Sequence, residues 1–169
     1  ENTDVHSLIE FLVGLSQSEL QNKVLKLALK LDAPRHHVHT DAARLQQVLW
    51  NVLRNAVKFT EQGGAITIIT SNDAHDRLDI TFHDTGIGMT PDTLSKLFIP
   101  FEQADPTINR RYGGLGLGMA ISNALVDLLD GEIRAESPGL GLGSTFTITF
   151  ATVAPAANGD ELTSASRKS

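Results

Sequence analysis

The sequence contains no cysteine, which excludes disulfide frameworks and thiolate metal sites. It has no apolar run long enough to span a membrane, and its first residues lack the pattern of a signal peptide. Lysine and arginine form no extended basic run, and the net charge is −6. Because binding to a phosphate backbone needs a basic face, nucleic acid is not expected as the main partner.

The 169 residues, of which 41% are hydrophobic, are enough for one globular domain with a proper core. Apolar periodicity predicts helices over residues 4–22, 41–60 and 118–129, and a short helix opened by Thr90 and Pro91. Alternation predicts strands over residues 24–32, 65–71, 77–84, 132–137 and 144–150, with a further short strand at the end of the loop 33–39.

This order of elements predicts an α/β (α+β) two-layer sandwich: a mixed sheet of about five strands with three main helices on one face. We expect a helical segment over residues 1–22, a domain over residues 23–150 and a flexible tail or linker over residues 151–169, where the composition changes. The apolar residues expected to face the core are Val5, Leu8, Ile9, Leu12 and Leu15 in the first helix, and Ile121, Leu125, Leu128 and Leu129 in the last.

The helix predicted over residues 41–60 organises the rest of the chain. Asp41 occupies the position of an N-cap, and Asn51, Asn55 and Lys58 recur at spacings of four and three, so they line one side. Amide oxygens, amide donors and an ammonium group suit a hydrated metal ion and phosphates. The alternative is that these residues are only the solvated face. The apolar residues of the opposite face are Leu45, Val48, Leu49, Val52, Leu53, Ala56 and Phe59.

A second candidate is the segment HDTGIGMT over residues 83–90. Asp84 ends a predicted strand, and a carboxylate there can accept a hydrogen bond from an exocyclic amine such as that of adenine. Gly86 and Gly88 leave room for a flat ring to approach the backbone. The alternative is an ordinary tight turn initiated by aspartate.

A third candidate is the glycine-rich segment RRYGGLGLGMAI over residues 110–121, which leads directly into a predicted helix. Such a segment can direct backbone N–H groups at phosphate, although a flexible hinge has the same composition. It is neither a Walker loop nor a dinucleotide fingerprint. Before it, residues 98–113 lose all periodicity and are expected to form a long mobile loop. The preceding LFIPFEQ, residues 97–103, could anchor this loop or a partner, or simply pack locally.

The six histidines are scattered, and none shows zinc-type spacing with a carboxylate. A Ser-His-Asp triad stays open, although no nucleophile elbow is present. We therefore expect ordinary structural or surface roles for His6, His36, His37, His39, His75 and His83.

Taken in order, NVLRNAVKFT, DTGIGM, LFIPFEQ, GGLGLGMAI and GLGSTFTITF resemble the N, G1, F and G2 boxes and the final strand of sensor histidine kinases. The resemblance covers about residues 23–150. It implies their catalytic ATP-binding domain, with the Bergerat-type fold of the gyrase–Hsp90–histidine kinase–MutL superfamily. The run LFIPFEQAD is most similar to hybrid kinases, whose chain continues into a receiver domain.

The resemblance also implies roles by position. Asn55 would coordinate Mg²⁺ with support from Asn51, Lys58 would contact phosphate, and Asp84 would bind the adenine amino group in a pocket shaped by Gly86 and Gly88. The loop over about residues 92–113 would close over the triphosphate. The remaining residues assigned to nucleotide binding are Phe98, Phe101, Arg110, Arg111, Gly114, Leu115, Gly116, Leu117, Gly118 and Thr145.

The implied reaction is phosphoryl transfer from Mg-ATP to a histidine imidazole, with the protein positioning the groups and neutralising charge. ATP-hydrolysing members of the superfamily carry a glutamate at the position of Asn51, so an amide here favours a kinase. The family's phosphoacceptor segment is absent, since His6 is followed by SLIE. The acceptor histidine would therefore lie upstream in the full protein, on a separate histidine-containing dimerisation domain, or on another chain.

The further partner implied is a response regulator or receiver domain, with a monomeric isolated domain and a homodimeric full protein. A cytoplasmic location is expected, and membrane attachment of a full receptor stays open. The family usually has threonine or serine where this chain has Leu115. A non-catalytic nucleotide-binding scaffold is therefore an alternative, and a superfamily ATPase is a third.

Overall fold

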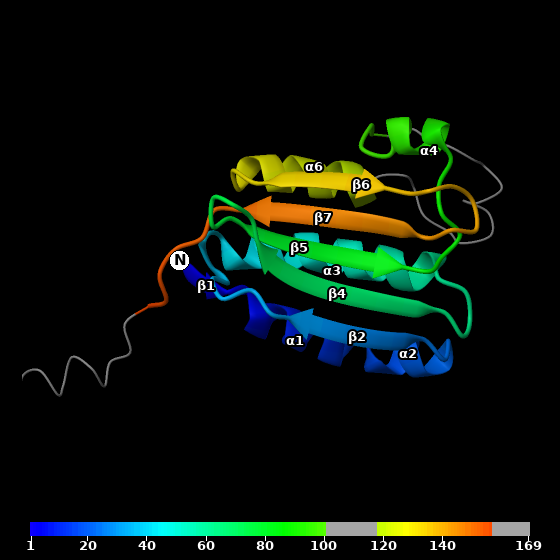
Figure 1. Ribbon diagram of the computed structural model, residues 1–169, viewed down its shortest axis with the longest axis horizontal. Coiled ribbons are helices and arrows are strands. Elements are labelled where there is room, and N and C mark those ends of the chain that lie inside the picture. Colours follow the sequence, from blue (N-terminus) through cyan, green and yellow to red (C-terminus); the bar gives the residue numbers. More distant parts are fainter. Residues whose placement is uncertain (101–117, 157–169) are drawn as a thin grey trace, which may run out of the picture.

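The computed structural model describes residues 1–100 and 118–156. Its helices are α1 (Val5–Leu15), α2 (Gln17–Asn22), α3 (Ala42–Phe59), α4 (Pro91–Lys96) and α6 (Gly118–Leu128). Its strands are β1 (Asn2–Asp4), β2 (Lys26–Leu31), β3 (His37–His39), β4 (Ala65–Asn72), β5 (Leu78–Asp84), β6 (Glu132–Glu136) and β7 (Ser144–Phe150). Figure 1 shows their arrangement.

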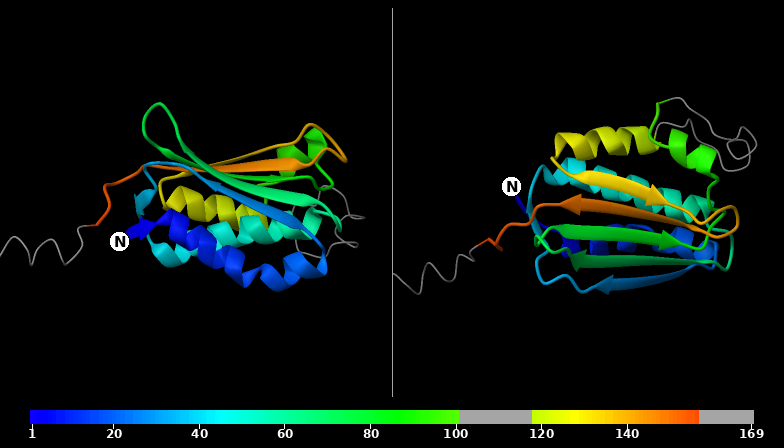
Figure 2. Two further views of the ribbon diagram at one scale, coloured as in Figure 1. Left: turned by 60° about the horizontal axis from the view of Figure 1, so that its bottom comes forward. Right: turned by 45° about the horizontal axis from the view of Figure 1, so that its top comes forward.

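A mixed five-stranded sheet forms one layer, in the order β2-β4-β5-β7-β6. β2 and β4 are parallel, and the other neighbouring pairs are antiparallel. Helices α1, α3 and α6 cover one face of this sheet, and the opposite face carries no helix from the described part of the chain (Figure 2). The predicted two-layer α/β sandwich is therefore confirmed.

The centre of the helical layer is α3, whose apolar face is buried as its periodicity predicts. Leu45, Leu49 and Val52 are inaccessible to solvent, and together with Ile66 and Ile80 of the sheet they belong to one continuous core. Asp41 is the N-cap, with its side chain accepting a hydrogen bond from the N–H of Arg44. Burial of this face fixes which side of α3 remains for polar side chains.

The N-terminal segment packs into the same core, because Val5, Ile9 and Leu12 of α1 are buried. The predicted helix over residues 4–22 is interrupted at Ser16, which ends α1. Leu15, at this end, is 57% exposed, so its expected burial was wrong.

A second, two-stranded sheet of β1 and β3 lies at one corner of the domain. The pattern predicted β3 but not β1, which has only three residues. The N–H of Val153 donates to the carbonyl of His37 at 2.8 Å, and Asn2 donates to the carbonyl of Ala154 at 2.8 Å. These bonds attach residues 153 and 154, within the segment expected to be a flexible tail or linker, to the corner. Residues 157–169 lie outside the described residues.

Helix α6 buries a different face from the one expected. Ile121 and Leu128 are 43% and 65% exposed, and Leu125 and Leu129 are only partly buried. Apolar residues surround this helix on most sides, so periodicity does not select one face. Packing against α3 selects the face that is buried, which consists of Met119, Ala120, Ser122 and Val126. No helix in the described part of the chain is long and apolar enough to cross a membrane.

Candidate nucleotide-binding site

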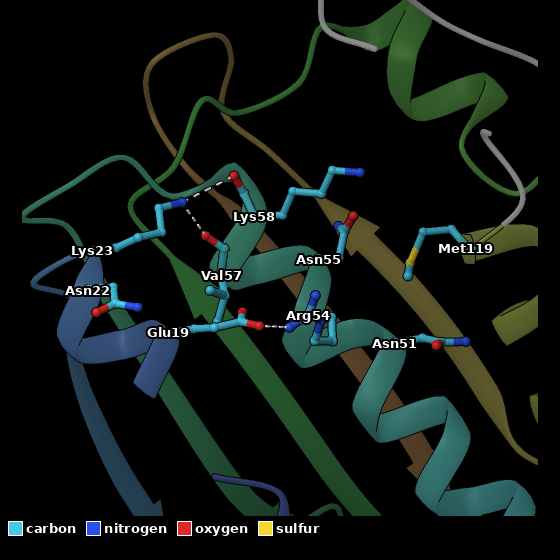
Figure 3. Close-up of a pocket in the computed structure, with 10 residues that line it drawn as sticks. Glu19, Asn22, Lys23, Asn51, Arg54, Asn55, Val57, Lys58 and Met119 are labelled. Atoms are coloured by element: carbon cyan, nitrogen blue, oxygen red, sulfur yellow. Dashed lines mark hydrogen bonds and ion pairs between the residues drawn. The ribbon is translucent and has the colours of Figure 1, made fainter. Parts of the chain in front are cut away.

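The C-terminal half of α3 borders a cavity of about 750 Å³ (Figure 3). Asn51, Asn55 and Lys58 line it together, and Gly118 and Met119, at the start of α6, lie across from them. The first turn of a helix leaves N–H groups unpaired and carries partial positive charge. The cavity is therefore lined by groups that suit an anion.

Asn51 helps to hold the two helices together at this cavity. Its amide donates to the hydroxyl of Ser122 at 3.3 Å, and that hydroxyl donates to the carbonyl of Gly118 at 2.9 Å. In contrast, the Asn55 side chain, half-buried, has no hydrogen bond with any described residue. Its amide oxygen is therefore available to a ligand in the cavity.

Basic side chains also line the cavity. Burial lowers the pKa of the Lys58 ammonium, and the nearby charge of Arg54 lowers it further. Arg54 forms an ion pair with Glu19 of α2. Lys23 donates to the carbonyls of Val57 and Lys58 at 2.6 and 3.3 Å, so it caps the end of α3. Of these side chains, Figure 3 shows Lys58 extending away from Lys23 and over the cavity.

Three residues at this cavity were not predicted as site residues: Lys23, Arg54 and Ser122. Arg54 is adjacent to Asn55, but that neighbourhood does not reveal its pairing with Glu19 across helices. Lys23 and Ser122 come from other elements, and no local pattern connects either of them with α3.

Asp84, at the end of β5, is only 3% exposed. Its Oδ1 accepts hydrogen bonds from the N–H groups of Gly86 at 2.9 Å and Ser144 at 3.2 Å. Its Oδ2 receives no hydrogen bond from any described residue. Burial raises the pKa of this carboxyl, and the two N–H donors oppose that effect. The predicted turn and an acceptor suited to an amine are thus both present.

The glycines after Asp84 are required by backbone packing. A Cβ on Gly86 would lie 2.4 Å from the carbonyl oxygen of Phe59, at the end of α3. Gly88 has a φ of +67°, and a Cβ there would lie 2.1 Å from the carbonyl oxygen of Gly139. The loop is therefore held between α3 and the β6–β7 turn, whether or not a ring approaches it. Gly86 also borders a separate hollow of about 490 Å³.

Thr145 does not lie beside Asp84. It pairs with His83 across β5 and β7, and the two side chains contact each other at 2.9 Å. Successive residues of a strand point to opposite faces, so Thr145 lies on the sheet face away from the helices. Ser144 is the residue of β7 that contacts Asp84. The alternation of Phe146, Ile148 and Phe150 could have placed Thr145 on the outer face.

Phe98 packs against the core as a partly buried side chain, and Gly118 begins α6 beside the cavity. The other candidates lie outside the described residues: Phe101, Arg110, Arg111, Gly114, Leu115, Gly116 and Leu117.

The model of the family "histidine kinase-, DNA gyrase B-, and HSP90-like ATPase" matches residues 40–153, from the residue before the N-cap of α3 to the segment after β7. The chain belongs to this family. The resemblance inferred from its motifs is therefore confirmed.

Among its relatives, the chain is 39% identical over 149 residues to the aerobic respiration control sensor protein ArcB of Escherichia coli, covering 87% of this chain and 19% of ArcB. It is 37% identical over 142 residues to the hybrid signal transduction histidine kinase F of Dictyostelium discoideum, covering 82% of this chain and 12% of that protein. The chain thus spans less than a fifth of the length of these relatives.

A solved structure of full-length ShkA in complex with AMPPNP has the same fold. Its TM-score is 0.77 at 30% identity, and the match covers 92% of this chain and 32% of ShkA.

Proposed function

We propose that this chain is the catalytic domain of a sensor histidine kinase, and that it binds Mg-ATP and donates the γ-phosphoryl group to a histidine on a separate dimerisation domain. The observation that carries the proposal is the convergence of Asn51, Asn55 and Lys58 on one cavity at the start of α6. The loop that packs on the end of α3 adds the buried Asp84, one oxygen of which accepts no hydrogen bond from a described residue. The AMPPNP complex of ShkA supports a nucleotide as the ligand.

Each residue has a chemical task in this proposal. Asp84 Oδ2 accepts a hydrogen bond from the exocyclic amine of adenine, while Oδ1 keeps its hydrogen bonds from the backbone N–H groups of Gly86 and Ser144. Lys58 neutralises phosphate charge, and the first N–H groups of α6 bind phosphate oxygens. Asn51 anchors the two helices through Ser122, which fixes the width of the cavity.

The donor set fits Mg²⁺, because Asn55 offers an amide oxygen without another partner in the described chain and Mg²⁺ prefers oxygen ligands, waters and phosphates. Asn55 would hold the ion, with support from Asn51. When bound, Mg²⁺ supplies charge neutralisation on the phosphates.

Transfer to histidine is favoured over hydrolysis because Asn51, an amide, lies where a carboxylate would be needed to activate water. The proposed partners are the histidine-containing dimerisation domain and a response regulator or receiver domain. The hybrid architecture named for the Dictyostelium relative supports the receiver domain.

Calorimetric titration with ADP and ATP, with and without Mg²⁺, tests the site. We expect Asp84→Asn to weaken binding on the order of 100-fold, because a charge-assisted hydrogen bond is replaced by an amide N–H facing the amine. His83→Asn is the matched control, since it changes the neighbouring residue on the outer face, and it should bind normally. Absence of nucleotide binding by the wild type would contradict the proposal.

Phosphoryl transfer is tested by adding an acceptor dimerisation domain and labelled ATP. The expected product is acid-labile phosphohistidine; an acid-stable product would contradict it. Binding without transfer at high acceptor concentration would favour the scaffold alternative, and a gain of transfer in Leu115→Thr would then identify Leu115 as the cause. Rapid ATP turnover without acceptor would favour the ATPase alternative.

A further inference from the structure

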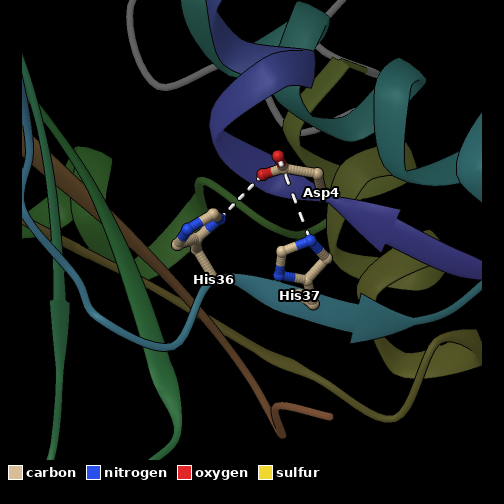
Figure 4. A group of neighbouring side chains, drawn as sticks. All are labelled: Asp4, His36 and His37. Atoms are coloured by element: carbon tan, nitrogen blue, oxygen red, sulfur yellow. Dashed lines mark hydrogen bonds and ion pairs between the residues drawn. The ribbon is translucent and has the colours of Figure 1, made fainter. Parts of the chain in front are cut away.

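Asp4, His36 and His37 form a cluster at the β1–β3 corner, away from the nucleotide cavity (Figure 4). Asp4 and His37 are directly opposite each other in the register of β1 and β3. His36 Nδ1 lies 2.7 Å from Asp4 Oδ1, and His37 Nε2 lies 4.0 Å from Asp4 Oδ2. All three side chains are only partly exposed.

One ligand atom from each residue lies within 4.8 Å of the other two, and within the described residues this is the one such group of His, Asp or Glu. In a tetrahedral zinc site with bonds of about 2.0–2.1 Å, ligand atoms are about 3.3–3.5 Å apart. The distance of 2.7 Å from His36 to Asp4 Oδ1 is shorter than that spacing, and the distance of 4.0 Å from His37 to Asp4 Oδ2 is longer. Binding one ion would therefore need side-chain rotations that move His36 away from Asp4 and bring His37 closer to it.

We propose that Asp4, His36 and His37 bind a divalent transition-metal ion of the Zn²⁺ class, with the fourth position open to water. Two imidazoles and one carboxylate are ligands that zinc accepts, and imidazole disfavours Mg²⁺ and Ca²⁺. The site is independent of nucleotide binding, so neither proposal depends on the other.

The surrounding contacts orient the ligands. The ring of His36 stacks on that of His6, with centroids 3.8 Å apart and planes within 9°. His6 is itself held by Thr70, its Nε2 lying 2.7 Å from Oγ1. Asp4 accepts hydrogen bonds from the N–H of His6 and the hydroxyl of Ser7. Such outer contacts fix ring and carboxylate orientation in metal sites.

A purely structural explanation of the cluster exists, because Asp4 caps α1 and pairs with His36. His37 separates the two explanations. At 4.0 Å from Asp4 it adds little to the ion pair, yet it supplies one of the three ligands of the metal site. Replacing it should leave the cap and the pair in place while weakening metal binding.

The test uses ZnCl₂ alone as the probe, with the full chain freed of metal by chelation. Calorimetry should show one zinc per wild-type chain, and the melting temperature should rise with zinc concentration. His37→Gln and Asp4→Asn should each weaken binding by roughly 10-fold or more, a loss at least as large as that for outer-contact residues. The asparagine of Asp4→Asn retains an oxygen to cap α1.

His39→Gln is the matched control, because His39 lies two residues along the same strand and pairs with no carboxylate in the described chain. It should bind zinc as the wild type does. The metal-free melting temperature of His37→Gln should equal that of the wild type, which shows that the variant is folded. No zinc binding by the wild type, unchanged binding in His37→Gln, or loss of binding only in His39→Gln would overturn the proposal.

Discussion

The loop that begins at Asp84 packs against the C-terminal end of α3, and the Asp4 cluster lies toward the other end. Each region contains a carboxylate, and the two carboxylates are in different states. Asp4 is stabilised by the N–H of His6, the Ser7 hydroxyl and His36. Asp84 is more deeply buried, and one of its oxygens has no donor from the described residues. Asp4 at the corner therefore stabilises the fold, whereas the buried charge of Asp84 destabilises it.

The pKa directions agree with this contrast. Burial alone would raise the pKa of Asp4, but hydrogen bonds from His36 and Ser7 outweigh it and hold the pKa below the ordinary value of 3.8. Burial raises the pKa of Asp84 above the same value. A buried carboxylate with a raised pKa, such as Asp84, is expected where a bound ligand supplies the hydrogen-bond donor that the protein does not.

The largest effect should come from the loop after Asp84. Gly88→Ala should destabilise the fold by about 3 kcal/mol, because it adds a close contact with the Gly139 carbonyl to the cost of a left-handed conformation. Gly141→Ala, with a φ of +78° and open space around its Cβ, should cost only about 1 kcal/mol. Urea unfolding of both variants measures the difference; equal losses would show that the close approach is unimportant.

The two carboxylates should respond to substitution with opposite signs. Asp4→Ala should lower the stability of the metal-free protein by about 2 kcal/mol, through loss of the α1 cap and of the pair with His36. Asp84→Asn should raise the melting temperature of the nucleotide-free protein, because a buried charge is removed while its oxygen still accepts the loop N–H groups. Thermal unfolding at neutral pH measures both changes. A lower melting temperature in both variants would contradict the predicted difference between the two carboxylates.

The two carboxylates should also differ in how they respond to a fall in pH. Because the pKa of Asp84 is raised, its proton returns above pH 3.8, and ADP affinity should fall about tenfold per pH unit below that raised pKa. The protonated Asp84 contributes fully to folding stability below pH 3.8, and this contribution is lost as the pH rises through the raised pKa. Asp4 is the reverse: its contribution is present above 3.8 and is lost as pH falls through its lowered pKa. Titrations with ADP, using Asp84→Asn as the pH-insensitive reference, check this prediction.

The smallest effect is expected at the rim of the cavity. Glu19 and Arg54 form an ion pair with side chains 45% and 47% exposed. Glu19→Gln should therefore change the free energy of unfolding by less than about 1 kcal/mol. It also frees Arg54 to face the cavity, so ATP affinity should stay the same or rise slightly. A marked loss of ATP affinity would assign Glu19 a direct role in the site.

Most of the fold could be predicted because each element carries its own periodicity. The alternating strands and the amphipathic α3 have one possible buried face each, and burial of that face fixes the elements around it. The pattern failed where it was ambiguous. Helix α6 is apolar on most sides, so contact with α3 chose Met119 and Val126 over Ile121 and Leu128.

The sequence predicted those parts of the candidate nucleotide site whose residues are close together in the chain. Asn51, Asn55 and Lys58 share one side of a helix, and Asp84 and its glycines are contiguous. The pairing of Arg54 with Glu19, the capping of α3 by Lys23 and the outward position of Thr145 involve neighbours from other elements.

By itself, the sequence determined the order of the main helices and of the five strands of the large sheet, the polar side of α3 and the loop that begins at Asp84. These features depend on residues close together in the chain. Only the tertiary structure decided which carboxylate is satisfied and which is not. Asp4 and His36 are separated by 32 positions, and no spacing rule connects them. The pairing of β1 with β3 brings them within hydrogen-bond distance, so a cluster with metal-binding chemistry exists only in the folded chain.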